Sequence, residues 1–133
     1  MNWRPLILLA FAMPAAVTMN VHAYEPERAM VNLSHELAEC AAYFAVVSTS
    51  PRLDEDTEAA LQKKSGAMLL AATQISNAEV AQARAELAMK TMAREMKNNW
   101  SNASIINNKY GYPCIDLFDD PETRMKYWLE KED

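Results

Sequence analysis

Glycine and histidine are nearly absent from this chain of 133 residues. It has two glycines, Gly66 and Gly111, and His35 is the only histidine beyond the N-terminal stretch. These numbers exclude a glycine-rich phosphate loop and the usual multi-histidine zinc sites. No CxxC pair and no GxSxG motif occurs, which argues against thioredoxin-type redox chemistry and a serine-hydrolase elbow. We therefore expect no catalytic residues, no metal ligands, no cofactor and no enzymatic activity.

Clustered basic charge is also missing. The chain has 13 Lys and Arg against 18 Asp and Glu, a formal net charge of −5. Lys63-Lys64 is the only adjacent basic pair. Nucleic acids and anionic lipids attract clustered Lys and Arg, so we expect neither a nucleic-acid partner nor adhesion to an anionic membrane.

The longest apolar stretch stands at the N-terminus. Arg4 precedes an apolar run from Pro5 to about Met19, and Val21-His22-Ala23 has the small residues that signal peptidase accepts before a cut. The run is short for a membrane span and is interrupted by Pro14. A cleaved signal peptide is thus favoured over a retained membrane anchor.

Cleavage after Ala23 removes residues 1–23 and leaves one domain over residues 24–133. We expect this domain to be periplasmic or secreted, with no membrane insertion after cleavage. The residue directly after the cut is Tyr24 and not a cysteine, which argues against a lipid anchor.

Between Asn32 and Trp100 the chain contains one proline and one glycine. No segment alternates apolar and polar residues with period two, so the sequence predicts helices and no sheet. The expected fold class is all-α: a small bundle of three main helices, plus a short C-terminal helical segment, with one disulfide.

The first predicted helix runs from about Leu33 to Thr49, with Asn32 as N-cap. The second runs from about Asp54 to Ile75, with acids in its first turns, where they complement the helix dipole. Both have an apolar stripe, formed by Leu33, Leu37, Cys40, Phe44 and Val47 in the first and by Thr57, Leu61, Met68, Ala72 and Ile75 in the second.

Ser76-Asn77-Ala78-Glu79 is a capping-box pattern and indicates a third helix from Asn77 to about Asn99. The alternative is one continuous helix over residues 54–100. The third helix has two apolar faces, which is typical of the central helix of a bundle or of a helix that also contacts a partner. Ala85, Met89, Met92, Met96 and Trp100 form one face, and Val80 and Leu87 lie nearly opposite.

The C-terminal residues predict two shorter helices. Gly111 is expected to stop the first. Asp120-Pro121 is a typical helix start, and Met125, Trp128 and Leu129 lie on one side of the last helix.

The two cysteines, Cys40 and Cys114, are expected to pair, because cysteines of exported chains usually form disulfides. Tyr110, Tyr112 and Phe118 are then expected to pack around the bond. A buried thiol at Cys40 and an intermolecular bridge at Cys114 are the alternatives.

Three sets of residues are candidates for a functional site. His35 and Glu39 are four apart on a helix, and a surface pair explains them better than catalysis. The acids of residues 116–122 do not match a calcium loop, and capping and solvation explain them. Met92, Met96 and Trp100 are the candidate binding residues, because methionine and tryptophan are enriched at the centres of protein interfaces. Packing in the core is the competing interpretation of the methionines.

These features favour a small exported helical module that binds a partner protein in the cell envelope. The layout of a small exported helical chain with two distant cysteines and a charged C-terminus resembles that of the periplasmic acid-stress chaperones. That resemblance implies an alternative, in which the protein opens under acid and binds unfolding clients. A carrier of an apolar ligand is the third hypothesis. Neither a specific partner nor an oligomeric state is predicted.

Overall fold

The computed structural model describes residues 25–131. The predicted signal peptide and the predicted cleavage site after Ala23 lie outside these residues. The described chain is all-α and contains no strand, so the predicted fold class is confirmed. The three long helices are α1 (Pro26–Ser48), α2 (Glu55–Ile75) and α3 (Ala78–Glu95). A C-terminal segment follows, made of η1 (Trp100–Asn102), α4 (Ala103–Ile106), η2 (Asn107–Gly111), α5 (Tyr112–Asp119) and α6 (Pro121–Glu130).

Three helices start at side-chain caps. Asp54, Asn77 and Asp120 each accept a hydrogen bond from the backbone N–H three residues further on, at 2.8, 2.9 and 3.0 Å. Such caps satisfy donors that have no partner within the helix. The cap at Asn77 separates α2 from α3, so the alternative of one helix over residues 54–100 is wrong.

Two predicted helix ends differ from the structure. α1 begins at Pro26 rather than Leu33. Proline is favourable in a first helical turn because it has no N–H to leave unsatisfied. α3 ends at Glu95 rather than near Asn99, since Lys97 and Asn98 have φ angles of 53° and 51°. Two successive residues in this left-handed region cannot continue a right-handed helix.

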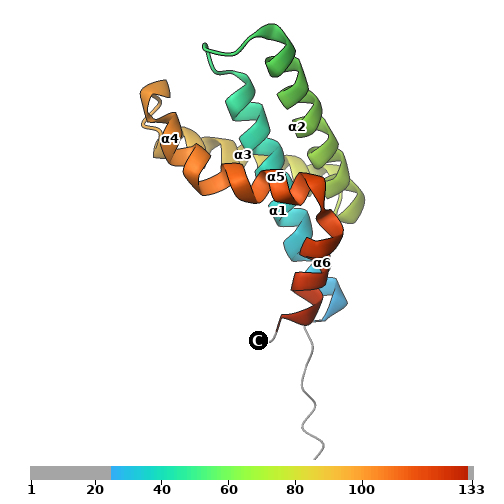
Figure 1. Cartoon of the computed structure of the whole chain (residues 1–133). Helices are drawn as coiled ribbons and strands as arrows, with labels where there is room; N and C mark the ends of the chain where they lie inside the picture. Colours follow the sequence, from blue (N-terminus) through green and yellow to red (C-terminus); the bar gives the residue numbers. More distant parts are fainter. Residues whose placement is uncertain (1–24, 132–133) are drawn as a thin grey trace, which may run out of the picture.

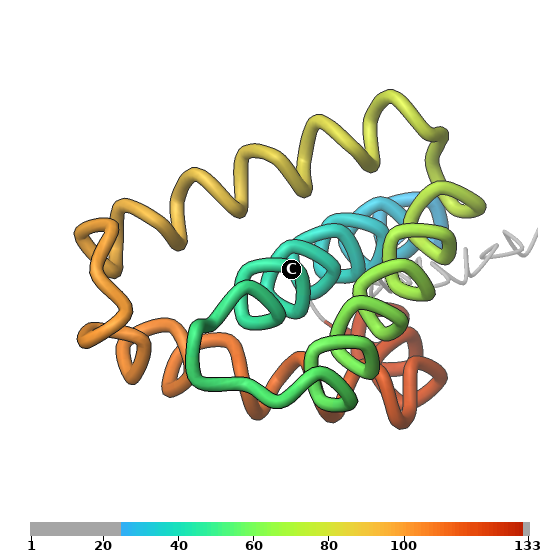
Figure 2. Tube along the Cα trace, turned by 90° about the horizontal axis from the view of Figure 1, so that it is seen from above, coloured from blue at the N-terminus to red at the C-terminus, as the bar shows by residue number. Residues whose placement is uncertain are grey.

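The central helix is α1 and not α3, so of the two interpretations of the apolar faces of α3, that of a central helix is wrong. α1 contacts α2, α3, α5 and α6. Figure 2 shows α1 between α2 and α3, with the C-terminal segment passing across it. α1 buries three alanines beside Leu37 and Phe44, namely Ala38, Ala41 and Ala42. Short side chains at these positions let the neighbouring helices approach closely.

The approach of α2 to α1 is marked by two hydroxyl groups. Ser65 Oγ donates to the carbonyl oxygen of Ala41 at 2.8 Å, and Ser34 Oγ donates to that of Ala72 at 3.3 Å. Gly66, next to Ser65, is exposed and has no atom within 4 Å of a Cβ built onto it. The close approach of the two helices is therefore made at Ser65 and not at Gly66.

Gly111 does not stop a helix as the sequence predicted. It ends a π-helical turn, η2, that leads directly into α5. A Cβ at this position would lie 3.0 Å from Tyr43 Oη, which donates to Asn107 Oδ1 at 3.1 Å. Gly111 therefore lets the C-terminal segment lie against the Tyr43 ring of α1.

The C-terminal segment lies across α1. In Figure 1, α5 crosses α1, and α6 then turns to run beside the first half of α1. Phe44 of α1 and Phe118 of α5 meet edge to face, with ring centroids 6.2 Å apart. This arrangement leaves a space between α1 and the two last helices, which is the candidate site.

Candidate functional site

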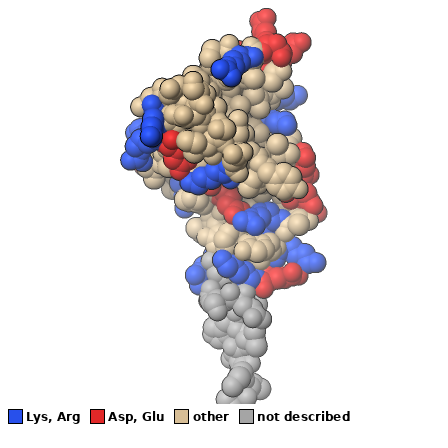
Figure 3. Space-filling view, turned by 60° about the vertical axis from the view of Figure 1, so that its left-hand side comes forward, with Lys and Arg blue, Asp and Glu red and all other residues tan. Residues whose placement is uncertain are grey.

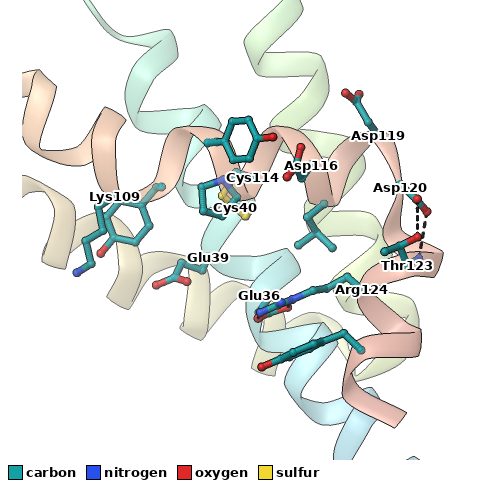
Figure 4. Close-up of a pocket in the computed structure, with 15 residues that line it drawn as sticks. Glu36, Glu39, Cys40, Lys109, Cys114, Asp116, Asp119, Asp120, Thr123 and Arg124 are labelled. Carbon is teal, nitrogen blue, oxygen red and sulfur yellow. Dashed lines mark hydrogen bonds and ion pairs between the residues drawn. A yellow bond between two sulfur atoms is a disulfide. The ribbon is translucent and has the colours of Figure 1, made fainter. Parts of the chain in front are cut away.

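An open groove of about 820 Å³ lies between α1 and the C-terminal segment. Its buried lining residues are Cys40, Tyr110, Cys114 and Leu117. Charged residues and tyrosines form its walls and rim. Figure 4 shows Glu36 and Glu39 on α1 opposite side chains of η2, α5 and α6. A concave site with an apolar base and a few polar groups is the usual form of a binding site.

The predicted disulfide is confirmed and forms part of the base of the groove. Cys40 and Cys114 are bonded, with their Cα atoms 5.2 Å apart. The bond fixes Glu39, the neighbour of Cys40, relative to the turn that carries Tyr112. Tyr112 does not pack around the disulfide as predicted, because its side chain is 75% exposed.

Glu36 joins α1 to α6. Arg124 donates to Glu36 through Nε at 2.8 Å to Oε2 and through a terminal nitrogen to Oε1. Trp128 Nε1 donates to Glu36 Oε2 at 3.0 Å. The Arg124 guanidinium lies over the Tyr127 ring, 4.4 Å from its centroid. The hydrogen bonds that Arg124 donates to Glu36 raise the pKa of Arg124.

A similar cluster stands at the other end of the groove. Lys109 Nζ donates to Glu95 Oε1 at 2.6 Å and lies 4.8 Å from the centroid of the Tyr110 ring. Tyr110 Oη donates to the same carboxylate oxygen at 3.3 Å. Burial raises the pKa of Tyr110. Both clusters thus consist of a carboxylate, a cation and a tyrosine ring.

Glu39 lies between these two clusters without a bonded cation of its own (Figure 4). Its partly buried carboxylate has no hydrogen bond or ion pair among the described residues. Burial raises the pKa of Glu39, and the charges of Glu36 and Glu95 add to this effect. His35 and Lys109 oppose it without contacting the carboxylate. The predicted surface pair of His35 and Glu39 is therefore not formed as a direct ion pair.

The rim of the groove carries two further carboxylates that have no counter-ion among the described residues. Asp116 and Asp119 are exposed and have no ion pair among the described residues. Tyr112 and Asp116 are four apart in α5, so they lie on one face of that helix. Asp120 differs from the other acids, because Thr123 donates to both of its oxygens. These two hydrogen bonds lower the pKa of Asp120.

The surface outside the groove is less distinctive. On the face in Figure 3, acidic and basic side chains are interspersed, with uncharged surface between them. Among residues 25–131 no helix has the length and apolar character needed to cross a bilayer. The same residues contain no cluster of three or more side chains arranged to hold a metal ion.

Two of the predicted binding residues are in the core. Met92 is 0% and Met96 is 5% exposed, so the expectation that they form an exposed surface is wrong. They are covered because α3 turns this face toward α1. Trp100 is partly exposed and packs against the core. A binding role for Trp100 stays a prediction. The opposite face of α3 is the open one, with Leu87 62% exposed.

Sequence reasoning missed most residues of the groove. Glu36 and Arg124 are 88 positions apart, and no local pattern links them. The available signal was the density of tyrosines, acids and proline around Cys114, together with the predicted bond to Cys40. That signal indicates a connection to α1, and only the fold shows which α1 side chains face it.

Comparisons with known proteins identify no relative. The chain matches no protein-family model, and searches of curated proteins and of solved structures gave no match. Support for a function therefore comes from the geometry of the groove and from the sequence.

Proposed function

We propose that this protein is a small, non-catalytic binding module of the cell envelope, which holds a partner protein in the groove between α1 and the C-terminal segment. The envelope location is taken from the N-terminal sequence. One observation carries the proposal: the groove has a disulfide in its base, yet Glu39 and Tyr112 in its lining have no hydrogen bond or ion pair among residues 25–131.

The energetics favour this interpretation of Glu39. A partly buried carboxylate without a hydrogen bond or counter-ion reduces the stability of the fold. Groups that reduce stability are found where function requires them. Tyr112 supports the same conclusion, because an exposed tyrosine is a frequent anchor of protein interfaces.

Cross-linking in the native host tests the proposal. A photo-reactive amino acid at position 112 should give a stoichiometric cross-link to one partner, whereas the same group at position 87 on α3 should not. Tyr112→Ala should weaken that partner's affinity by at least about tenfold. Leu87→Ala is the matched control, since both side chains are mostly exposed. Equal cross-linking from the two positions would show that the groove is not the binding surface.

An acid-activated chaperone is the second candidate, and the attachment of α6 favours it. Glu36 accepts hydrogen bonds from both Arg124 and Trp128, so the attachment of α6 to α1 depends on this one carboxylate. This candidate predicts capture of unfolded clients at low pH only. Stoichiometric binding of one folded partner at neutral pH would count against it.

A carrier of an apolar ligand is the third hypothesis and has less support. It needs a pocket among the methionines, and Met92 and Met96 are packed in the core. Extraction of a stoichiometric lipid from native protein would favour the carrier.

A further inference from the structure

We infer that the groove binds a segment of the partner that carries Lys or Arg, with Glu39 as the counter-ion of one cationic side chain. This inference rests on the proposed function and names the chemistry of the partner. It follows from the balance of charges in the groove and from a repeated arrangement of side chains.

The balance of charges is negative after internal pairs are counted. Arg124 is neutralised by Glu36, and Lys109 is neutralised by Glu95. Asp120 also keeps its charge, but both of its carboxylate oxygens already accept hydrogen bonds from Thr123. Among residues 25–131, Glu39, Asp116 and Asp119 are the carboxylates of the lining with neither a cation nor a hydrogen bond. A cationic segment complements these three charges, whereas an acidic one would be repelled.

The repeated arrangement indicates how a cation is bound. Two tyrosine rings of the groove, Tyr110 and Tyr127, already carry a cation of this chain, with a carboxylate on that cation. Tyr112 is the third tyrosine of the lining and carries no cation from the described part of the chain. Its ring and Asp116 on the same face of α5 offer a second cation the same combination of ring and carboxylate. Glu39 offers its partly buried carboxylate to another cationic side chain of the same partner segment.

A peptide segment suits the groove better than a small cation. The volume of about 820 Å³ lies in the range of sites that bury several connected groups. The exposed rings of Tyr112 and Tyr127 in the lining offer contacts that a small polar cation cannot make. A chain with basic and aromatic side chains meets both requirements.

Titration of the oxidised protein with defined peptides, followed by NMR, tests the inference. The probe is the end-blocked peptide Gly-Lys-Phe-Arg-Gly. Its matched control has norleucine and citrulline in place of Lys and Arg, which removes the charges and keeps the length. The cationic peptide should shift amide signals of α1 near Glu39 and of α5 near Tyr112. The neutral peptide should bind at least about tenfold more weakly.

Two variants separate the role of Glu39 from that of net charge. Glu39→Gln should weaken the affinity for the cationic peptide by about tenfold. Glu86→Gln makes the same change of net charge at an exposed position of α3, outside the groove, and should leave the affinity unchanged. A melting curve of each variant establishes that it is folded.

Several results would overturn the inference. Equal affinity for the neutral peptide, or an unchanged affinity in Glu39→Gln, would show that charge recognition is absent. Spermidine or Ca²⁺ binding as tightly as the peptide would show that the site takes a small cation. If no peptide binds but the cross-link at position 112 persists, the cationic class is wrong and the binding module stands. If the cross-link is absent as well, both proposals fail.

Discussion

In α1, α2 and α3 the buried side chains are mainly alanine, leucine and methionine, whereas the C-terminal segment is attached to α1 through more specific contacts. These are the Cys40–Cys114 bond, the Glu36–Arg124 ion pair and the contact of Phe44 with Phe118. Apolar packing tolerates changes that conserve volume, but ion pairs and disulfides need particular partners. The groove lies between α1 and the C-terminal segment, where these specific contacts are made. Substitutions that remove each kind of contact test the comparison of the two regions.

The disulfide should give the largest effect, since it links the two regions across 74 positions. Replacing both Cys40 and Cys114 with serine should lower the free energy of unfolding by about 4 kcal/mol. The physical reason is the larger conformational freedom of the unfolded chain without the cross-link. Urea denaturation measures this loss. A loss below about 1 kcal/mol would show that the other contacts hold the segment without the bond.

A core substitution should give the next largest effect. Met92→Ala should lower the free energy of unfolding by about 3 kcal/mol, because it leaves a cavity in a fully buried site. Leu87→Ala on the open face of the same helix should change it by less than about 0.5 kcal/mol. If the Met92→Ala protein kept its stability but lost binding, the binding role predicted for Met92 from the sequence would be supported instead.

Replacing each of the two glycines with alanine should change the stability of the protein in opposite directions. Gly66→Ala should stabilise the protein by about 0.5–1 kcal/mol, because the site is an open helix interior. Gly111→Ala should destabilise it by about 1–2 kcal/mol, because the new Cβ presses on Tyr43 and displaces the C-terminal segment. Thermal melting of the two variants measures both changes. Stabilisation by Gly111→Ala would contradict the close contact with α1.

The smallest effect concerns the ionisation of Glu39. Burial raises the pKa of Glu39 in the folded state, so its stabilising contribution is present at low pH and is lost as pH rises through the folded pKa. Glu39→Gln should therefore be more stable than the unaltered protein at neutral pH, by less than about 1 kcal/mol because the side chain is only partly buried. The difference should vanish below about pH 4. A less stable Glu39→Gln at neutral pH would mean that Glu39 has a stabilising partner.

Local patterns predicted the long helices well. Asp54, Asn77 and Asp120 were recognisable as helix starts because a cap acts over three or four residues. The buried stripe of α1 followed from its spacing, and the disulfide followed from the number of cysteines.

The errors arise where the structure depends on distant partners. Gly111 looks like a helix stop in sequence, but its role is set by Tyr43, which comes from α1. The choice of α1 as the central helix depends on which apolar face each helix turns inward, and amphipathic spacing alone does not determine it. Glu39 belongs to the candidate site only because the disulfide brings α5 across α1.

Hydrogen exchange of the oxidised protein and of the variant lacking both cysteines tests the comparison most directly. If the C-terminal segment is an attachment that depends on the bond, amides of residues 100–130 should lose most of their protection in the variant. Amides in the middle of α1, α2 and α3 should keep theirs after correction for the change in global stability. An equal loss of protection in all helices would contradict this account, because the C-terminal segment would then be part of one cooperative core.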